Sequence, residues 1–250
     1  NCFIFEFEIN GVPQKIMMEC GIPLSDIYKK CNNLGIQFSD IKACLITHMH
    51  SDHSKSAKDI ARLNIPILAS KSTLETLKVK GRIIEEEKPN KVLNGLFVFP
   101  FKVEHDVEGS IGFLIKSATE TMIFINDCKL WKTNLINFKP DFVFIECNYD
   151  HKIVYAQIYE LQSAQKKVDL SEKEKKEINT QLSQHTRNIN AHMSLNGCLK
   201  GLHKLNLHHC KMICLMHLSD RYANEYKMKN SVQSEFGIKT CVAGKHGGIK

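Results

Sequence analysis

The chain has 250 residues, of which 43% are hydrophobic, enough apolar material for one large domain or two small ones. Its composition does not match a disordered, collagen-like or repetitive chain. No apolar run reaches the ~18–20 residues that span a bilayer, so we expect no membrane partner. Lys and Arg exceed Asp and Glu by 34 − 27 = 7, which favours anionic partners such as nucleotides, nucleic acid or phosphate esters. On charge alone, a basic protein without such a partner is an equal alternative.

The ten cysteines are scattered, mostly within apolar segments such as "KACLI" and "MICLM", and no two of them have C-x-x-C spacing. Buried free thiols in a reducing compartment explain this pattern better than a disulfide framework or a zinc ribbon does. We therefore expect a cytoplasmic protein without disulfides.

The N-terminal segment predicts a β-hairpin. Apolar and acidic side chains alternate over residues 3–9, and "NGVP" turns the chain into a second strand at 14–20. Because the chain begins within a strand, we expect that an initiator Met and a first strand are absent. A helix over 21–36, starting at Ser25 or Asp26, follows, and a buried strand at 39–48 then leads into a cluster of histidines.

The remaining elements alternate between strands and helices. The patterns predict helices at 54–64 and 71–81, the second closed by Gly81, and strands at 65–70, 96–105, 109–118, 121–127 and 141–147. Beyond the middle of the chain they predict a helix at 196–207, a strand at 210–217, a helix at 220–237 and a strand at 238–244. No glycine-rich phosphate loop of the G-x-G-x-x-G or G-x-x-x-x-G-K type is present, which argues against a nucleotide-binding Rossmann or P-loop protein.

Residues 152–187 differ in character from the rest, since they are rich in Gln, Lys and Glu and poor in β-formers. We interpret them as two helices broken near "VDLSEKE", where Ser171 and Glu174 form a capping box. Three roles remain open for this insertion: a lid over a site, an arm that packs against a second subunit in a homodimer, or a solvated charged hairpin.

The segment "THMHSDH" concentrates metal ligands directly after a predicted strand. His48 and His50 are two residues apart, so at a strand end both imidazoles project to the same side and can bind one cation. Asp52 and His53 lie just beyond and could reach a second cation, since zinc-type ions bind imidazole and carboxylate at ~2.0–2.2 Å. A solvated polar turn would not explain why the segment contains almost nothing but ligands.

Further candidate ligands stand at the ends of separate strands. They are His105 in "FKVEHDVEG", Asp127 in "MIFIND" and His217 in "ICLMH". Each alone would be an ordinary polar residue at a strand end, but together with the first cluster they indicate one metal site along a sheet edge. The other histidines, which lack such a context, are expected at the surface or in packing; these are His151, His185, His203, His208, His209 and His246.

These motifs resemble a known family. T-H-x-H-x-D-H, then "HDVEGSIGFLI", a strand ending in Asp, "FIECNYD", "NINAHMSLNG" and "LMHLSDRY" are similar to the metallo-β-lactamase superfamily. The similarity is to its phosphodiesterase branch, which contains tRNase Z, YycJ/WalJ-type nucleases and anti-Pycsar cyclic-nucleotide phosphodiesterases. The resemblance implies an α+β fold, a four-layer αββα sandwich, as one domain over residues 1–250 with its first strand truncated.

The resemblance also implies roles for residues. His48, His50 and His105 would bind one metal ion; Asp52, His53 and His217 would bind a second; Asp127 would bridge them, and His192 would lie beside the metals without binding. Imidazole-rich ligation suits zinc, with manganese as the alternative. Two positions depart from the family pattern: Glu19 replaces the usual Asp in a D-x-G turn, and Tyr149 stands where nuclease relatives often have His.

The implied reaction is hydrolysis of an anionic phosphodiester by hydroxide that two metals activate. Asp52 would position the hydroxide, and His192 would donate a hydrogen bond or a proton to the phosphoryl or leaving oxygen. The substrate is either nucleic acid or a cyclic nucleotide. Trp131 is the sole tryptophan, and the sequence has no dense basic and aromatic stretch of the kind that grips a polymer.

Two other functional classes are weighed against this hypothesis. A hydrolase of the same fold could act on a lactone or a thioester, although "AHMS" and "HLSDRY" argue for a phosphodiester. A binding protein that has lost its metal is disfavoured, because all seven candidate ligands are present.

Overall fold

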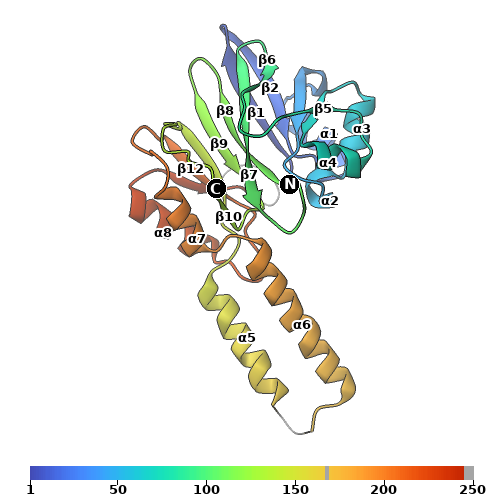
Figure 1. Ribbon diagram of the computed structural model, residues 1–250, viewed down its shortest axis with the longest axis vertical. Helices are drawn as coiled ribbons and strands as arrows, with labels where there is room; N and C mark the ends of the chain where they lie inside the picture. The colour runs from blue at the N-terminus through green and yellow to red at the C-terminus, as the bar shows by residue number, and fades with distance from the viewer. Residues whose placement is uncertain (167–168, 245–250) are drawn as a thin grey trace.

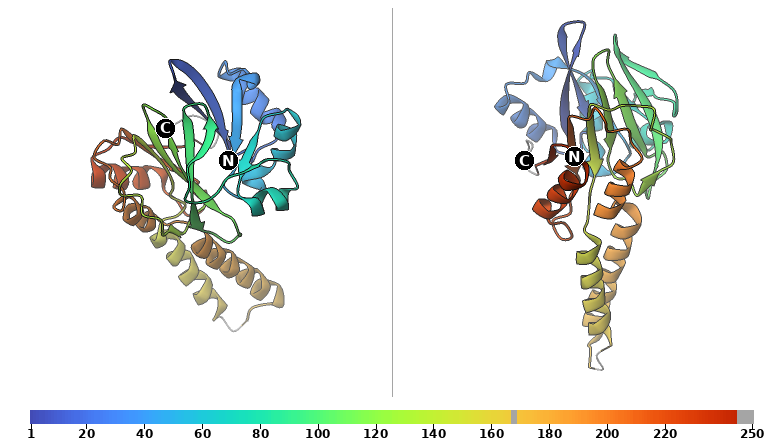
Figure 2. Two further views of the ribbon diagram at one scale, coloured as in Figure 1. Left: turned by 45° about the horizontal axis from the view of Figure 1, so that its top comes forward. Right: turned by 90° about the vertical axis from the view of Figure 1, so that its left-hand side faces the viewer.

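The computed structural model describes residues 1–166 and 169–244. In it, two β-sheets face each other, helices cover their outer faces, and a pair of long helices projects from one end (Figure 1, Figure 2). The first sheet has the strand order β1-β2-β3-β4-β5. Its strands are β1 (Phe3–Ile9), β2 (Val12–Met18), β3 (Ile41–Leu45), β4 (Ile67–Ala69) and β5 (Arg82–Ile83).

The second sheet has the order β10-β7-β8-β9-β11-β12-β13, and β6 pairs with β7. Its strands are β6 (Asn90–Leu93), β7 (Leu96–Glu104), β8 (Ile111–Lys116), β9 (Thr121–Ile125), β10 (Leu130–Trp131), β11 (Phe142–Glu146), β12 (Met212–Met216) and β13 (Thr240–Val242). The short strands β5, β6 and β10 were not predicted, because two to four residues show no clear alternation.

Three apolar clusters define four layers. Inward side chains of both sheets, such as Ile16 and Phe113, form the cluster between the sheets. A second cluster packs the first sheet against helices, which are α1 (Leu24–Asn33), α3 (Ala57–Arg62) and α4 (Lys71–Leu77). A third packs the second sheet against α7 (Leu195–Leu202) and α8 (Glu225–Phe236). The predicted αββα sandwich is therefore confirmed.

One edge of the sandwich collects the carboxyl ends of many strands. β2, β3 and β4 are parallel neighbours in the first sheet, and β9, β11 and β12 are parallel neighbours in the second. β7 also points the same way as β9, because both pair antiparallel with β8. Residues that follow these strands therefore meet at one edge, although they are far apart in sequence.

The insertion forms a helical hairpin made of α5 (His151–Gln165) and α6 (Glu172–Ala191), which extends well away from the sheets (Figure 1, Figure 2). The predicted capping box at Ser171 and Glu174 is present, with both reciprocal hydrogen bonds. The predicted break near "VDLSEKE" begins at position 168, and positions 167 and 168 lie outside the described residues. At the base of the hairpin, the side chains of Tyr149, Val154 and Tyr222 form a small buried cluster.

Several predicted helix limits were wrong. α4 ends at Leu77, and Lys78, rather than Gly81, adopts the left-handed conformation that closes it. α1 begins directly after Pro23, one or two residues before the predicted starts. α8 begins at Glu225, since the side chain of Asn224 caps it by accepting from the Lys227 N–H. The helix predicted at 196–207 already ends at Leu202. The remaining short elements are the 3₁₀ turn η1 (Phe38–Asp40) and α2 (Ser51–Ser54).

Candidate active site

Acidic and imidazole side chains converge at the shared edge of the two sheets. They come from positions at or just after the carboxyl ends of six strands: Glu19 after β2, His48 after β3, His105 after β7, Asp127 after β9, Glu146 at the end of β11 and His217 after β12. The loop and short helix α2 that follow β3 add His50, Asp52 and His53. All seven residues predicted as metal ligands thus lie in one place.

The first candidate ion site consists of His48, His50, His105 and Asp127. Nε2 of His48 lies 3.0 Å from Nδ1 of His50, which lies 3.3 Å from Nε2 of His105. Oδ2 of Asp127 lies 3.9 Å from Nε2 of His48 and 3.8 Å from Nε2 of His105. Ligands bound tetrahedrally at ~2.1 Å are about 3.4 Å apart, so these separations suit an ion of that kind.

The second candidate ion site consists of Asp52, His53, Asp127 and His217. Nε2 of His53 lies 3.2 Å from Oδ2 of Asp52 and 3.3 Å from Oδ2 of Asp127. Nε2 of His217 lies 3.6 Å from Oδ2 of Asp52, and its Nδ1 lies 3.1 Å from Oδ1 of Asp127. Asp127 therefore belongs to both sets, as expected of a bridging ligand.

An unsatisfied atom supports ion binding at this edge. Oδ1 of Asp127 is buried and accepts no hydrogen bond from any described residue, although Nδ1 of His217 lies 3.1 Å away. A buried carboxylate oxygen without a hydrogen bond is costly, because it has lost water without fully replacing it. A divalent cation would satisfy it, and the chemistry of the surrounding ligands, imidazole and carboxylate, fits such an ion.

Each of the five ligand histidines has its remaining ring nitrogen near a protein oxygen. Nδ1 of His48 donates to Oγ1 of Thr47 at 2.9 Å, and the Thr47 hydroxyl in turn donates to Glu19 at 2.6 Å. Nδ1 of His105 donates to the Ala191 carbonyl at 3.0 Å. These contacts leave the opposite nitrogens unprotonated, which is the form that binds metal.

The other three histidines follow the same pattern, with carboxylates as neighbours. Nε2 of His50 lies 3.5 Å from Oδ1 of Asp106. Nδ1 of His53 lies 3.5 Å from Oε1 of Glu19, and Nδ1 of His217 lies 3.2 Å from Oε1 of Glu146. The contact of His217 with Glu146 is a hydrogen bond, of the kind that orients an imidazole and raises its basicity as a ligand. Nδ1 of His53 forms no hydrogen bond with any described residue, so Glu19 acts on it only through its charge.

Glu19, which stands where the family pattern has Asp, contacts two residues of the candidate site. Its side chain is fully buried and reaches both Thr47 and His53. The backbone at Glu19 has φ 62°, a left-handed conformation that it shares with Asp127 (φ 47°) and His217 (φ 56°). Such conformations cost roughly 1–3 kcal/mol each in non-glycine residues. Their concentration at three site positions indicates that placement of the side chains dictates the backbone here.

His192 is held at the site by Glu146. The residue caps the C-terminal end of α6, and its Nδ1 lies 2.7 Å from Oε1 of Glu146. The second oxygen of Glu146 accepts from the backbone N–H groups of Cys128 and Met193. His192 Nδ1 is 4.0 Å from Oδ2 of Asp127, so the ring lies beside the candidate ion sites.

The local charges shift the pKa values of these groups in opposite directions. Burial, together with the neighbouring His53, lowers the pKa of His48 to about 2, which keeps it neutral. Burial would also lower the pKa of His217, but the carboxylates of Asp127, Asp52 and Glu146 outweigh it and raise the value to about 10. Burial tends to raise the pKa of Asp127, but His217 and His53 hold it below its usual range.

A pocket of about 390 Å³ opens over these residues. Asp52, Asp127, His192 and His217 line it on the side of the sheets, and Gln184, Arg187 and Asn188 line it from α6. Its volume is at the small end of the range for small-molecule sites. The base of the helical hairpin is therefore one wall of the candidate active site.

Three site residues were not predicted from the sequence: Glu146, Asp106 and Arg187. Asp106 lies 3.1 Å from Nε2 of His105 and pairs with Arg187 of α6 at 3.1 Å. The signal for Glu146 was a charged residue that ends an otherwise apolar strand, "FVFIE". Tyr149 is buried, and its backbone forms a β-bridge with Ser194.

The histidines expected outside the site do lie elsewhere, within the part of the chain that the structure describes. His185 is buried in α6, where its ring packs on Tyr222 with centroids 5.1 Å apart. His203 pairs with Glu235 on the surface. His246 lies outside the described residues. All ten cysteines are free, as predicted.

The four-layer sandwich with its edge of histidines and aspartates defines a metal-binding hydrolase class, the metallo-β-lactamase fold. Residues 23–217 match the family model described as "Beta-lactamase superfamily domain", and the chain belongs to this superfamily. The resemblance found in the sequence is thereby confirmed. No helix among residues 1–166 and 169–244 is long and apolar enough to cross a bilayer.

One curated relative is Ribonuclease J of Sinorhizobium meliloti, which is 26% identical over 155 residues. This match covers 54% of the chain but only 27% of the relative, so the chain spans about a quarter of that protein.

Solved structures share the fold at low sequence identity. YhfI from Bacillus subtilis has a TM-score of 0.64 at 15% identity, over 95% of this chain and 86% of that one. Zinc-bound PqqB from Methylobacterium extorquens has a TM-score of 0.63 at 14% identity, over 96% of this chain and 84% of that one. A diphosphatase of the PhnP family has a TM-score of 0.62 at 15% identity, over 94% of this chain and 79% of that one.

Proposed function

We propose that this chain is a dinuclear metal-dependent phosphodiesterase. The observation that carries the proposal is the pair of candidate ion sites that share Asp127. His192 lies outside these two sets, although it also forms a third group of possible ligands with Asp127, Glu146 and His217. Zinc is the preferred metal because imidazole provides five of the seven ligands, and manganese is the alternative.

Two ions bound here would supply Lewis acidity, lower the pKa of a water molecule and neutralise charge on a phosphate. The residues around them supply orientation. The Asp52 side chain is 56% exposed, so it can orient an attacking water molecule from the open side of the pocket.

His192 is the candidate general acid. Glu146 accepts from its Nδ1, which leaves Nε2 as the atom that can donate a proton to the leaving oxygen. Burial tends to lower the pKa of His192, but its contact with Glu146 raises the value above the ordinary one and so keeps a proton available near neutral pH. Glu146 thus acts through His192, as a positioning residue.

The relatives and the charge support an anionic substrate. Ribonuclease J, which by its name acts on RNA, matches the chain over 155 residues, and the net charge of +7 favours an anionic substrate. Both nucleic acid and cyclic nucleotides satisfy these conditions. A neutral lactone or thioester would not need the excess positive charge.

A hydrolysis assay tests the proposal, with zinc and with manganese in parallel. The substrates are bis(4-nitrophenyl) phosphate, 3′,5′-cyclic nucleotides, end-labelled single-stranded DNA and RNA, a lactone and a thioester. We expect hydrolysis of phosphodiesters and a large loss in His192→Ala, with His203→Ala as the matched surface control. Hydrolysis of the lactone or the thioester, with every phosphodiester intact, would overturn the proposal.

A further inference from the structure

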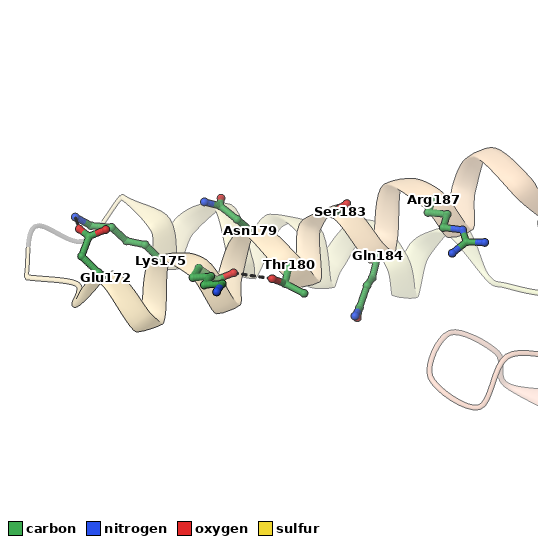
Figure 3. A pocket seen from close by; sticks show the side chains of 8 residues that line it. Glu172, Lys175, Asn179, Thr180, Ser183, Gln184 and Arg187 are labelled. Carbon is green, nitrogen blue, oxygen red and sulfur yellow. Dashed lines mark hydrogen bonds and ion pairs between the residues drawn. The ribbon is translucent and has the colours of Figure 1, made fainter.

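Shallow hollows follow the exposed surface of α6 from the tip of the hairpin to the active-site pocket. Figure 3 shows the side chains that line the hollow between Glu172 and Arg187. Gln184 and Arg187 line both the outer hollow and the active-site pocket, so the two surfaces are continuous. We call this surface the α6 strip and define it by the residues that line these hollows along α6, from Glu172 to Arg187, together with Arg221 beside it.

The α6 strip is positively charged. It contains five cations against two acids, Glu172 and Glu177, and the cations are Lys173, Lys175, Lys176, Arg187 and Arg221. Lys175 is paired with Glu172 at 2.8 Å. Lys173, Lys176 and Arg221 form no ion pair with any residue that the structure describes, so their charges are available to a ligand.

Hydrogen-bonding side chains lie between these cations. Asn179, Thr180, Ser183 and Gln184 project from α6 in the same stretch, and Figure 3 shows them spaced along the helix between Lys175 and Arg187. Amides and hydroxyls of this kind, together with Lys and Arg, are the usual partners of phosphate and sugar oxygens. An apolar partner surface would instead be matched by apolar side chains.

Arg187 connects the strip to the chemistry. Its side chain is 74% exposed at the mouth of the pocket, and its guanidinium pairs with Asp106, which in turn contacts the candidate ligands His50 and His105. A phosphate that approaches along α6 would meet this side chain before it reaches the candidate ion sites.

We propose that the α6 strip binds the phosphate backbone of a single-stranded nucleic acid and that Arg187 guides the strand into the active site. This inference rests on the proposed phosphodiesterase function and names its substrate as a polymer. From Lys173 to Arg187 the strip is about 21 Å long, because an α-helix rises 1.5 Å per residue. That length spans several successive phosphates, and the strip leads into the pocket of about 390 Å³. A cyclic mononucleotide would fill the pocket and meet the strip only at its inner end, at Gln184 and Arg187.

The test compares two sets of charge-neutralising variants. The strip variant carries Lys173→Gln, Lys176→Gln and Arg221→Gln. The control variant carries Lys58→Gln, Lys80→Gln and Lys116→Gln, which remove the same charge from exposed positions on the sandwich. Binding is measured by fluorescence anisotropy with a labelled strand of about 20 nucleotides whose phosphorothioate linkages resist hydrolysis. Hydrolysis of bis(4-nitrophenyl) phosphate is measured in parallel.

We expect the strip variant to raise the Kd for the strand at least ~10-fold. We also expect the slope of the logarithm of the binding constant against the logarithm of the salt concentration to become shallower by about 2, because each lost phosphate contact removes about 0.7 from it. Its hydrolysis of the small ester should equal that of the wild type, and the control variant should change the Kd less than ~3-fold. Equal Kd values for the strip variant and the wild type would overturn the inference.

Failure of the proposed function gives a different result. If the wild type hydrolyses no phosphodiester but binds the strand through the strip, the phosphodiesterase proposal fails while the binding surface stands. If the strip variant binds the strand normally but changes its mass in light scattering, the surface is an interface between two copies of the chain, and the inference is wrong.

Discussion

Nδ1 of His192 and Oε1 of the fully buried Glu146 lie 2.7 Å apart, and the same oxygen lies 3.2 Å from Nδ1 of His217. One carboxylate therefore orients both the candidate general acid and a candidate ligand of the second ion. Glu146 ends β11, which lies between β9 and β12. Its side chain therefore reaches the segments that follow both neighbouring strands, at Cys128 and at His217.

The first prediction distinguishes the role of His192 from the role of Glu146. We expect His192→Ala to lower kcat for a phosphodiester ~10²–10⁴-fold, the usual contribution of a general acid, while the metal content stays unchanged. Glu146→Gln should lower both activity and metal affinity, the latter ~10–100-fold, because His217 also loses its partner. The measurements are kcat for a phosphodiester, the metal content and the metal affinity of both variants. Metal loss in His192→Ala would identify His192 as a ligand.

The second prediction concerns the relay from His48 through Thr47 to Glu19. Thr47→Val keeps the shape of the side chain but removes the hydroxyl that accepts from His48 and donates to Glu19. We expect ~10–100-fold weaker metal binding, measured by competition with a chromogenic chelator. Thr240→Val removes another buried hydroxyl, far from the ligands, and serves as the control. Equal affinity in both variants would contradict a role for the relay.

The third prediction concerns metal and stability. Ligand binding to the native state stabilises a protein by about 2.7 kcal/mol at 100 times the Kd, which corresponds to a rise in Tm of about 5–10 °C for a chain of this size. Zinc should therefore raise the Tm of the chelator-treated protein. Asp127→Ala, which removes the shared ligand, should abolish this shift in differential scanning calorimetry. A full shift in Asp127→Ala would refute the bridging role.

The fourth prediction concerns Gly21, in the turn after Glu19. A Cβ at this position would lie 1.6 Å from the Asp52 carbonyl oxygen, so the turn packs directly against the loop that bears the ligands. We expect Gly21→Ala to lower the free energy of unfolding by at least about 1–3 kcal/mol. In α7, a Cβ at Gly197 would meet the flexible Met193 side chain at 3.1 Å and Oγ of Ser194 at 3.4 Å, so Gly197→Ala should be neutral or stabilising. Urea denaturation compares the two variants.

The fifth prediction concerns Asp150, which caps α5 and bonds Nζ of Lys227 at 2.6 Å. Burial tends to raise its pKa, but Lys227 and the Lys152 N–H outweigh burial and lower it. A lowered folded-state pKa means that the charged form adds stability above the unfolded pKa, and that this stability is lost as the pH falls through the folded pKa.

Asp150→Asn keeps a capping side chain but removes the charge, so it isolates this contribution. We expect the variant to be less stable by about 1–2 kcal/mol at pH 7, with the difference shrinking below about pH 4. Urea denaturation at both pH values measures it. Asp59→Asn, which alters an exposed pair with Arg62, should change stability little at either pH.

The candidate ligands could be found from the sequence because their signals are local. His48, His50, Asp52 and His53 lie within six consecutive positions, and His105, Asp127 and His217 each follow an apolar strand. Parallel strands bring their carboxyl ends to one edge whatever the details of the loops, so position along the chain was sufficient.

Glu146 and Arg187 could not be found in this way, because their roles depend on which elements become neighbours. Glu146 acts across strands whose order the sequence pattern does not fix. Arg187 belongs to a helix that reads as a solvated charged surface over most of its length. Only the position of the last turns of α6 at the pocket gives this arginine a role.

The last turn of α6 sets a limit on how the insertion can vary. The Ala191 carbonyl accepts from His105, and the next residue is His192, so the helix ends in two fixed attachments. Because successive residues of an α-helix are rotated by about 100°, deleting one residue between Arg187 and His192 would turn the imidazole away from Glu146. Lengthening or trimming the hairpin at its tip leaves that rotational phase untouched. The reach of the hairpin can therefore change independently of the chemistry at its base.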